Sequence, residues 1–307
     1  MKISIVTPTY NEVSNIEKLY NEIKNQFTKI EYDYEHIIID NNSNDGTIEK
    51  LRQLASSDKN LKVILNTKNF GHIKSPFHGL LQSSGDATIL MASDFQDPID
   101  MIPKYIEEWK KGKKIVLGEK IKSEENFMKF FFRKMFYKFL NYISDLKLTI
   151  NTTGSGIFDR SVIEKLKKVQ DPYPYFRGLI SEIGYEISTI KFHQPKRLSG
   201  KTKNNFFTLY DIGMLGIVKH SRKPLRFMIL IGFIIGLISL ATGLFYLIYK
   251  LLFWNSFSLG IAPVVVGIFF VSSVQIILLG LVGEYIGVIL IHTRNMPIVI
   301  EKERINF

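Results

Sequence analysis

The sequence has 307 residues, which is enough for one sizeable α/β domain and a smaller part. It contains no cysteine, so structural disulfides and thiolate metal sites are excluded. The net charge of +11 is concentrated: residues 110–138 carry ten Lys and Arg against three Glu, and residues 196–226 carry eight against one Asp. Such stretches suit a phosphate, a membrane surface or nucleic acid, with a solvated basic face as the alternative for the first.

Short apolar runs alternate with helical segments through the first part of the chain. Strands are predicted at residues 3–7, 34–40, 61–66, 87–92 and 114–118, and helices at 14–27, at 47–55 and after Gly71. This alternation indicates a mostly parallel, doubly wound sheet, which binds ligands beyond the carboxyl ends of its strands. Three of these ends carry polar clusters, at residues 8–12, 41–47 and 93–98. The predicted site lies there.

Two long apolar stretches occupy the last third. Residues 227–249 carry no charge, and residues 259–291 are interrupted only by Gln275 and Glu284. Each can span about 30 Å of hydrocarbon. Basic residues flank the pair on both outer sides, so the positive-inside rule puts both termini in the cytoplasm and the turn with Trp254 outside. A buried helical hairpin of a soluble protein is the alternative.

Two further segments are predicted to lie at the membrane interface. Residues 127–142 interleave aromatic side chains with cations, as a helix in the headgroup region does. A core helix with exposed lysines is the alternative. Residues 206–218 are a weaker candidate that leads into the first span.

The polar clusters supply oxygen atoms suited to a nucleotide and a metal. Asp94 and Gln96, two residues apart, could face one side and hold a hard divalent cation beside phosphates. Asp40, at the end of a strand, could accept hydrogen bonds from a base or a ribose. Each signal alone is weak, because acidic residues are common in turns.

Together and in this order, the clusters are specific. Pro8-Thr-Tyr-Asn-Glu12, Asp40-Asn-Asn-Ser-Asn-Asp-Gly-Thr47, Asn69-Phe-Gly71 and Asp94-Phe-Gln-Asp-Pro98 resemble family-two glycosyltransferases with a GT-A domain. Arg197-Leu-Ser-Gly-Lys-Thr-Lys203, two spans and Gly283-Glu-Tyr-Ile-Gly287 narrow the resemblance to the polyprenyl-phosphate glycosyltransferases. That group includes dolichyl-phosphate mannose synthase and bactoprenol glucosyltransferases. The resemblance covers nearly the whole chain.

The resemblance implies a donor site and a metal. The positions that match the nucleoside pocket are Pro8, Tyr10, Glu12 and Asp40. Asp94 and Gln96 match ligands of Mg²⁺ or Mn²⁺ near the donor diphosphate. Several relatives have a further Asp where this chain has Ala92, which leaves the metal to Asp94, Gln96, donor oxygens and water. Residues 153–158 also lack the Asp-Phe-Arg run common in relatives.

The resemblance also implies an acceptor site. Arg197 and Lys203 match a loop that closes over the diphosphate and the acceptor. Lys120 stands where many members have an arginine for the acceptor phosphate. Arg133 is our choice for a second phosphate contact, with Lys134 as the alternative.

The acceptor chemistry predicts the mechanism. A phosphate monoester is already anionic at neutral pH, so no general base has to deprotonate it. In-line attack at the anomeric carbon would invert its configuration, helped by a metal and cations in a partly dry cleft. Asp97 could orient the acceptor or the sugar, or act as a base, and a helix cap before Pro98 is the alternative.

The expected architecture is α/β, namely a GT-A (Rossmann-like) nucleotide-sugar domain, interfacial helices and a two-span transmembrane hairpin. We expect the domain at 1–204, a juxtamembrane segment at 205–226, the spans within 227–291 and a cytoplasmic tail at 292–307. The location would be a bacterial-type cytoplasmic membrane. The substrates would be a nucleotide sugar, with UDP-glucose as the default, and a polyprenyl phosphate such as undecaprenyl phosphate.

Other readings are weaker. A processive polysaccharide synthase would need more spans and a Gln-x-x-Arg-Trp motif, and neither tryptophan follows an arginine. A non-catalytic scaffold remains an alternative because Ala92 stands where several relatives have a further Asp. Nucleic-acid binding is not supported, because no nucleic-acid-binding module is recognisable. Glu284 is a functional candidate because a charge in lipid is unfavourable, and a position facing the headgroups or a pair with Arg294 is the alternative. We expect a homo-oligomer, a tetramer being one option, with Gly280, Gly283 and Gly287 letting helices approach closely.

Overall fold

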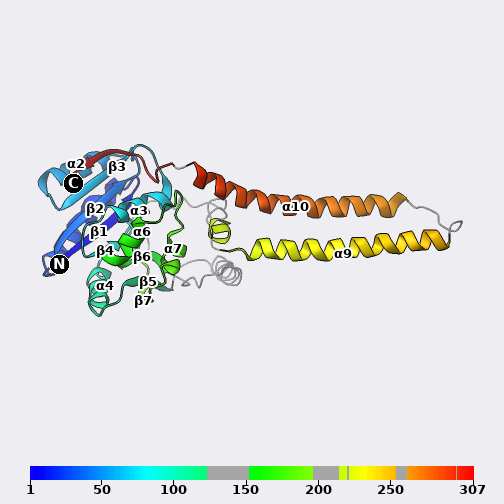
Figure 1. Ribbon diagram of the computed structural model, residues 1–307. Coiled ribbons are helices and arrows are strands. Elements are labelled where there is room, and N and C mark those ends of the chain that lie inside the picture. The colour runs from blue at the N-terminus through cyan, green and yellow to red at the C-terminus, as the bar shows by residue number, and fades with distance from the viewer. Residues whose placement is uncertain (123–151, 196–213, 220, 254–260, 295) are drawn as a thin grey trace.

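The computed structural model describes residues 1–122, 152–195, 214–219, 221–253, 261–294 and 296–307. An eight-stranded sheet organises the globular part, and two long helices extend from it (Figure 1). The strand order is β7-β5-β6-β4-β1-β2-β3-β8. The strands are β1 (Lys2–Thr9), β2 (Asp33–Asp40), β3 (Leu61–Asn66), β4 (Ala87–Leu90), β5 (Ile115–Lys122), β6 (Thr152–Asp159), β7 (Ile187–His193) and β8 (Glu301–Ile305).

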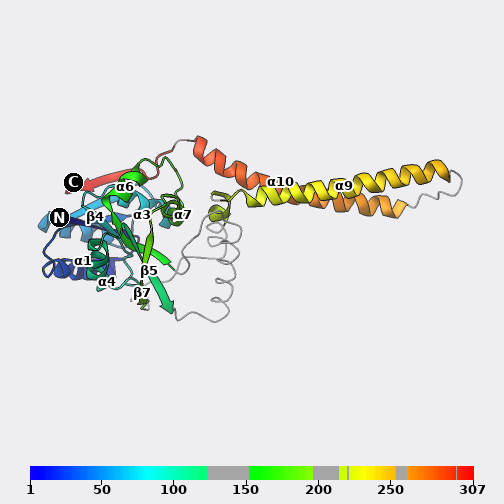
Figure 2. The same ribbon diagram turned by 60° about the horizontal axis from the view of Figure 1, so that its bottom comes forward.

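Helices cover both faces of this sheet (Figure 2). One face packs against α1 (Val13–Phe27), α2 (Thr47–Ser57) and α4 (Met101–Lys110). The other face packs against α3 (Gly71–Leu81), α6 (Arg160–Lys167) and α7 (Phe176–Glu182). The α/β fold with a doubly wound sheet, predicted from the sequence, is therefore confirmed.

The central strands are apolar along their whole length because both faces are covered. In β1, Ile3 and Ile5 lie in the core under α1 and α2, whereas Val6 lies in the core under α3. All three side chains have no exposed surface. Burying one such side chain contributes about 1.5–3 kcal/mol, so a continuous apolar strand is favoured only in the interior of such a layered fold.

The sheet is mixed. β4, β1, β2 and β3 form its parallel centre, and β5 pairs in parallel with β7. β6 lies antiparallel between β4 and β5, and β8 lies antiparallel against β3. The five predicted strands are present with boundaries moved by a few residues, whereas β6, β7 and β8 were not predicted.

The two apolar stretches form the long helices α9 (Lys223–Leu252) and α10 (Ile261–Thr293). Among the described residues, these are the two helices long and apolar enough to cross a membrane, with mean hydropathy of 2.5 and 2.3 over their candidate spans. Neither span is buried inside the protein. A core hairpin of a soluble protein would bury these side chains, so that alternative is excluded and the helices indicate membrane association.

The end of the chain differs from the predicted tail. Residues 301–305 return from the hairpin and add β8 to the edge of the sheet (Figure 1). The globular part therefore includes a strand from beyond the spans and is not confined to residues 1–204. The predicted interfacial helix at 127–142 and the turn with Trp254 lie outside the described residues.

Candidate active site

Three strand ends bring the predicted polar clusters to one edge of the sheet. Thr9 at the end of β1 is paired with Asp40 at the end of β2, and Val6 is paired with Leu90 at the end of β4. The backbone N–H of Met91 donates to the carbonyl of Val6 at 3.1 Å. The residues after each strand therefore emerge at the same carboxyl edge, as the sequence predicted.

The loop after β2 is built on Asp40. This carboxylate has no exposed surface and accepts hydrogen bonds from the backbone N–H of Ser43 at 2.8 Å and from the Ser43 hydroxyl at 2.5 Å. The Ser43 Oγ also accepts the backbone N–H of Asn11 at 2.8 Å. Burial raises the pKa of Asp40, and the bonds from Ser43 oppose that rise. Asp40 thus orders the loops after β1 and β2, a role that the sequence did not reveal.

The residues predicted for the nucleoside pocket lie in or beside these loops. Pro8 is in β1, and Tyr10, which is half-buried, directly follows that strand. The backbone N–H of Glu12 donates to the Thr47 hydroxyl at 3.0 Å, and the Glu12 carboxylate accepts from the Asn15 amide at 2.7 Å. The first two polar clusters are therefore joined to each other by hydrogen bonds.

The loop after β4 holds two buried carboxylates. Asp94 is 8% exposed and Asp97 is 6% exposed. The backbone N–H of Gln96 donates to Asp94 Oδ1 at 3.1 Å, and between them Phe95 adopts a left-handed conformation with φ of 58°. This turn places the Asp94 carboxylate beside the residue that was predicted as its co-ligand.

Asp97 is fixed through one of its two oxygens. Oδ2 accepts the backbone N–H of Ala92 at 3.0 Å and a hydrogen bond from the Ser155 hydroxyl. The helix α4 begins after Asp100, without a side-chain cap. Asp97 is therefore not the helix cap that was the alternative interpretation. Ser155, in β6, was missed by sequence reasoning.

The electrostatic setting of Asp97 links it to two predicted site residues. Burial raises its pKa most, and the negative charge of Asp94 adds to that rise. The Ser155 and Ala92 hydrogen bonds and the positive charge of Lys120 oppose it. Lys120 lies in β5 and Ser155 lies in β6, so these two strands and the loop after β4 together make up the surroundings of Asp97.

The donor atoms suit a divalent cation shared with a ligand. Asp94 and Gln96 supply one carboxylate and one amide oxygen, and in the described part of the chain no three His, Cys, Asp or Glu side chains form a metal-binding group. Mg²⁺ commonly binds one or two carboxylates together with waters and substrate phosphates, and oxygen ligands also suit Mn²⁺. The neighbouring negative charges of Asp94 and Asp97 would both be stabilised by such an ion. The residues therefore fit a metal held jointly with a diphosphate.

The predicted cationic contacts are only partly described. Lys120 is at the site, whereas Arg133, its alternative Lys134, Arg197 and Lys203 lie outside the described residues.

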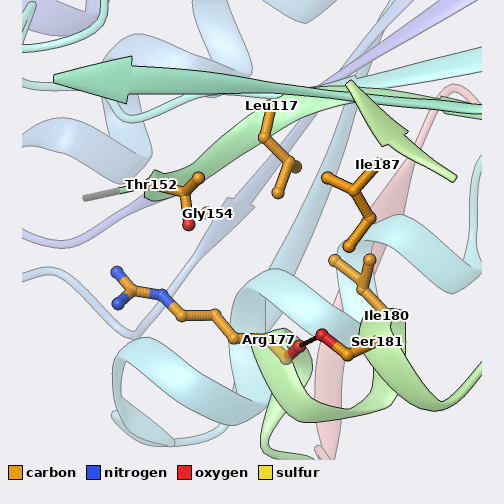
Figure 3. A pocket seen from close by; sticks show the side chains of 7 residues that line it. All are labelled: Leu117, Thr152, Gly154, Arg177, Ile180, Ser181 and Ile187. Carbon is orange, nitrogen blue, oxygen red and sulfur yellow. Dashed lines mark hydrogen bonds between the residues drawn. The ribbon is translucent and has the colours of Figure 1, made fainter. Parts of the chain in front are cut away.

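A separate small cavity is lined by residues of β5, β6, β7 and α7 (Figure 3). Its volume of about 10 Å³ admits no more than one water molecule. The residues lining it come from β5, β6, β7 and α7: Leu117, Thr152, Gly154, Arg177, Ile180, Ser181 and Ile187. This cavity is too small for a sugar nucleotide. The carboxyl edge is the candidate active site because the predicted polar clusters meet there.

Comparison with curated proteins gives relatives that match along nearly the whole chain. A bactoprenol glucosyl transferase from a prophage of Shigella flexneri is 33% identical over 299 residues, covering 97% of this chain and 96% of that protein. An uncharacterised glycosyltransferase of Bacillus subtilis, YkcC, is 31% identical over 304 residues, covering 98% of this chain and 93% of that protein. Both alignments include the region of the apolar hairpin.

Comparison with solved structures shows the fold. Glucosyl-3-phosphoglycerate synthase from Mycobacterium tuberculosis, solved with Mn²⁺, UDP-glucose and phosphoglyceric acid, matches with a TM-score of 0.50 and 18% identity. The match covers 71% of this chain and 77% of that one. The model of the family described as glycosyl transferase family 2 matches residues 4–167. Together with the full-length relatives, this match shows that the chain belongs to glycosyl transferase family 2.

Proposed function

We propose that this glycosyltransferase moves a hexose, with glucose as first choice, from a nucleotide diphosphate to a polyprenyl phosphate at the cytoplasmic face of a membrane. The observation that carries the proposal is the full-length similarity, spans included, to a protein named bactoprenol glucosyl transferase. An apolar hairpin next to a GT-A site suits a lipid acceptor that never leaves the membrane. UDP is the proposed nucleotide, and undecaprenyl phosphate is the proposed lipid.

The donor is proposed to bind along the carboxyl edge. Pro8, Tyr10, Glu12 and the Asp40 loop would hold the nucleoside, because they form one connected wall at the ends of β1 and β2. Asp94 and Gln96 would hold Mg²⁺ or Mn²⁺ beside the diphosphate. Neutralising charge on the leaving diphosphate is the chemistry that such an ion supplies.

The acceptor phosphate is proposed to meet Lys120 and, from outside the described residues, Arg133, Arg197 and Lys203. Two anions brought to 4 Å repel by roughly 4 kcal/mol at an effective dielectric of about 20, so cations must offset that repulsion. Lys120 lies where its charge already acts on Asp97. The acceptor oxygen would attack the anomeric carbon in line as the nucleotide leaves, which inverts the configuration.

Asp97 is proposed to orient the sugar or the acceptor and not to act as a base. A phosphate monoester has a second pKa near 6 and needs no deprotonation. Ser155 and Ala92 both bind Oδ2 of Asp97, so Oδ1 takes neither of these hydrogen bonds. That oxygen can be directed at a hydroxyl group of the sugar.

The test is a donor screen in nanodiscs that contain the purified protein and undecaprenyl phosphate. UDP-glucose should give a labelled, chloroform-extractable product that releases the sugar in mild acid, and the protein with Asp94→Asn should give almost none. Transfer only to water, or from no nucleotide sugar at all, would contradict the proposal. Product from a different nucleotide sugar would keep the reaction class and change the hexose.

The homo-oligomer remains a prediction. Gly280, Gly283 and Gly287 on α10 have open space where a side chain would stand, so a neighbouring helix could approach there.

A further inference from the structure

The hairpin joins the globular part through a buried ion pair. The Lys219 ammonium donates to both carboxylate oxygens of Asp171, at 2.5 and 2.6 Å, and to the carbonyl of Tyr173 at 2.5 Å. The side chains of Lys219 and Asp171 are only 6% and 10% exposed. Lys219 is the last residue of a short helical segment, residues 214–219, that precedes α9. Asp171 lies in the loop between α6 and α7.

The second membrane helix reaches the same place. His292, at the end of α10, lies with Nε2 3.6 Å from Asp171 Oδ1. The hydroxyl of Tyr285, also in α10, donates to the carbonyl of Ser221 at 2.9 Å. Asp171 is therefore approached by the segment that enters the hairpin and by the helix that leaves it.

Apolar contacts support this junction. Leu215 packs with Tyr175, and both side chains are under 9% exposed. Ile73 at the start of α3 and Ile217 pack against the same pair. The segment before α9 is thus seated on the globular part by a buried ion pair and a small apolar cluster.

A second attachment follows α10. The backbone N–H of Thr67 donates to the carbonyl of Ile300 at 3.0 Å, and β8 then pairs with β3. Arg52 in α2 binds Glu303 in β8 at 2.6 Å. Because the chain is attached on both sides of the hairpin, the helices have little freedom to tilt while both attachments hold.

We propose that Asp171 is a positioning residue that holds the hairpin at a fixed orientation on the globular part, so that the site at Asp94 and Asp97 faces the headgroup of a membrane-embedded acceptor. This inference rests on the proposed function. Asp171 lies in a different loop from Asp94 and Asp97 and acts through Lys219. Removing its charge leaves a buried ammonium without its counterion, which favours separation of the two parts.

The kinetic test compares one acceptor in a membrane with one in solution. Asp171→Asn should raise KM for undecaprenyl phosphate in nanodiscs by on the order of 10- to 100-fold. The reason is that the globular part no longer keeps a fixed orientation toward the membrane, so the acceptor phosphate is less often aligned with the active site. Affinity for UDP and turnover of a water-soluble short-chain prenyl phosphate in detergent should stay unchanged. Glu17→Gln, which removes a carboxylate from the exposed pair with Lys50, is the matched control and should change neither.

The structural test does not depend on sugar transfer. The natural sequence has no cysteine, so spin labels at Lys168 and Ile289 report one distance between the globular part and α10. The distance distribution in nanodiscs should be narrow in the otherwise natural protein, broad with Asp171→Asn, and narrow again when Asp171→Lys is combined with Lys219→Asp. If Asp171→Asn does not fold, that exchanged pair must still restore a narrow distribution and activity.

A narrow distribution with Asp171→Asn, or an equal loss with membrane and soluble acceptors, would overturn the inference. Should the natural protein transfer no sugar to any prenyl phosphate, the proposed function fails while the distance measurement still judges the attachment.

Discussion

At the scale of single residues, Asp97 combines stability with function. Its pKa is raised chiefly by burial, so the folded protein takes up a proton at Asp97 more readily than the unfolded chain does. The stabilisation from this proton is complete below the unfolded pKa and is lost as pH rises through the folded pKa. Wherever the pH ionises Asp97, the buried carboxylate therefore destabilises the fold, at a site where Asp97 is proposed to orient the sugar or the acceptor.

The raised pKa of Asp97 gives a prediction for the stability of the Asp97→Asn variant. The substitution removes the ionisable group but keeps an oxygen that can accept from Ser155 and Ala92. We expect Tm to rise at pH 8, the gain to shrink as pH falls toward 4, and transfer to undecaprenyl phosphate to be strongly reduced. Thermal unfolding in detergent across this pH range checks it. A Tm below that of the natural protein at pH 8 would contradict the burial argument.

Asp94 gives a second prediction, concerning the metal. Asp94→Ala should lower turnover by on the order of 10²–10³-fold, because charge stabilisation at the leaving diphosphate is lost. Gln96→Ala should have a smaller effect, since a neutral ligand is replaceable by water. Metal titrations followed by calorimetry with UDP present measure the ion's affinity separately from activity. Full activity of Asp94→Ala in excess EDTA would remove the metal assignment.

The residues of the site were not equally predictable. Asp40 ends one apolar strand, and Asp94 and Gln96 follow another, so their shared edge could be read from the pattern of a parallel sheet. The position of Ser155 could not be predicted in this way, because Ser155 lies in an antiparallel strand whose glycine-rich sequence does not indicate a strand. A Cβ at Gly156 would lie 2.2 Å from the Val116 carbonyl, so this strand pairing requires glycine there.

At the scale of elements, the three strands that were not predicted from the sequence were missed for two reasons. β6 contains two glycines, and β7 and β8 are edge strands with exposed charged side chains. An edge strand needs only one apolar face, and charges on it discourage pairing with other chains. The sequence Glu-Lys-Glu-Arg-Ile of β8 consequently resembles a solvated tail, and its partner β3 lies more than 230 residues away in sequence.

The attachment of β8 to the edge of the sheet gives a third prediction, which concerns Asn306. This residue adopts a left-handed conformation with φ of 63°, and its amide donates to the carbonyls of Ala55 at 2.7 Å and Leu61 at 2.8 Å. Asn306→Gly keeps the backbone freedom but loses these hydrogen bonds, and should lower the free energy of unfolding by about 1–3 kcal/mol. Denaturant unfolding followed by tryptophan fluorescence measures this, with Lys302→Ala as the control. Equal stability of the two variants would show that the Asn306 side chain does not stabilise the attachment of β8.

At the scale of the whole molecule, the globular part and the hairpin differ in whether they bury or expose their apolar side chains. The sheet encloses its apolar side chains, whereas Phe233 and Ile277 in the long helices remain 64% and 71% exposed. A row of such side chains is stable only against lipid or another protein. The helices, about 45–50 Å long at 1.5 Å per residue, exceed the roughly 30 Å hydrocarbon layer, so their ends reach the headgroups.

The orientation of this hairpin is the last prediction. Arg222, Lys223 and Arg226 precede or open α9, and Arg294 follows α10, so the basic ends lie on the side of the globular part. The positive-inside rule then places that part in the cytoplasm and the predicted turn between the two spans outside. Because the sequence has no cysteine, Ser256→Cys introduces a single thiol, which an impermeant reagent should label in intact cells. Ser56→Cys, exposed on α2, is the matched control and should react only after permeabilisation. Labelling of Ser56→Cys but not of Ser256→Cys in intact cells would put the active site outside, away from cytoplasmic nucleotide sugars. Labelling of both thiols in intact cells would mean that the helices do not cross the membrane as a hairpin.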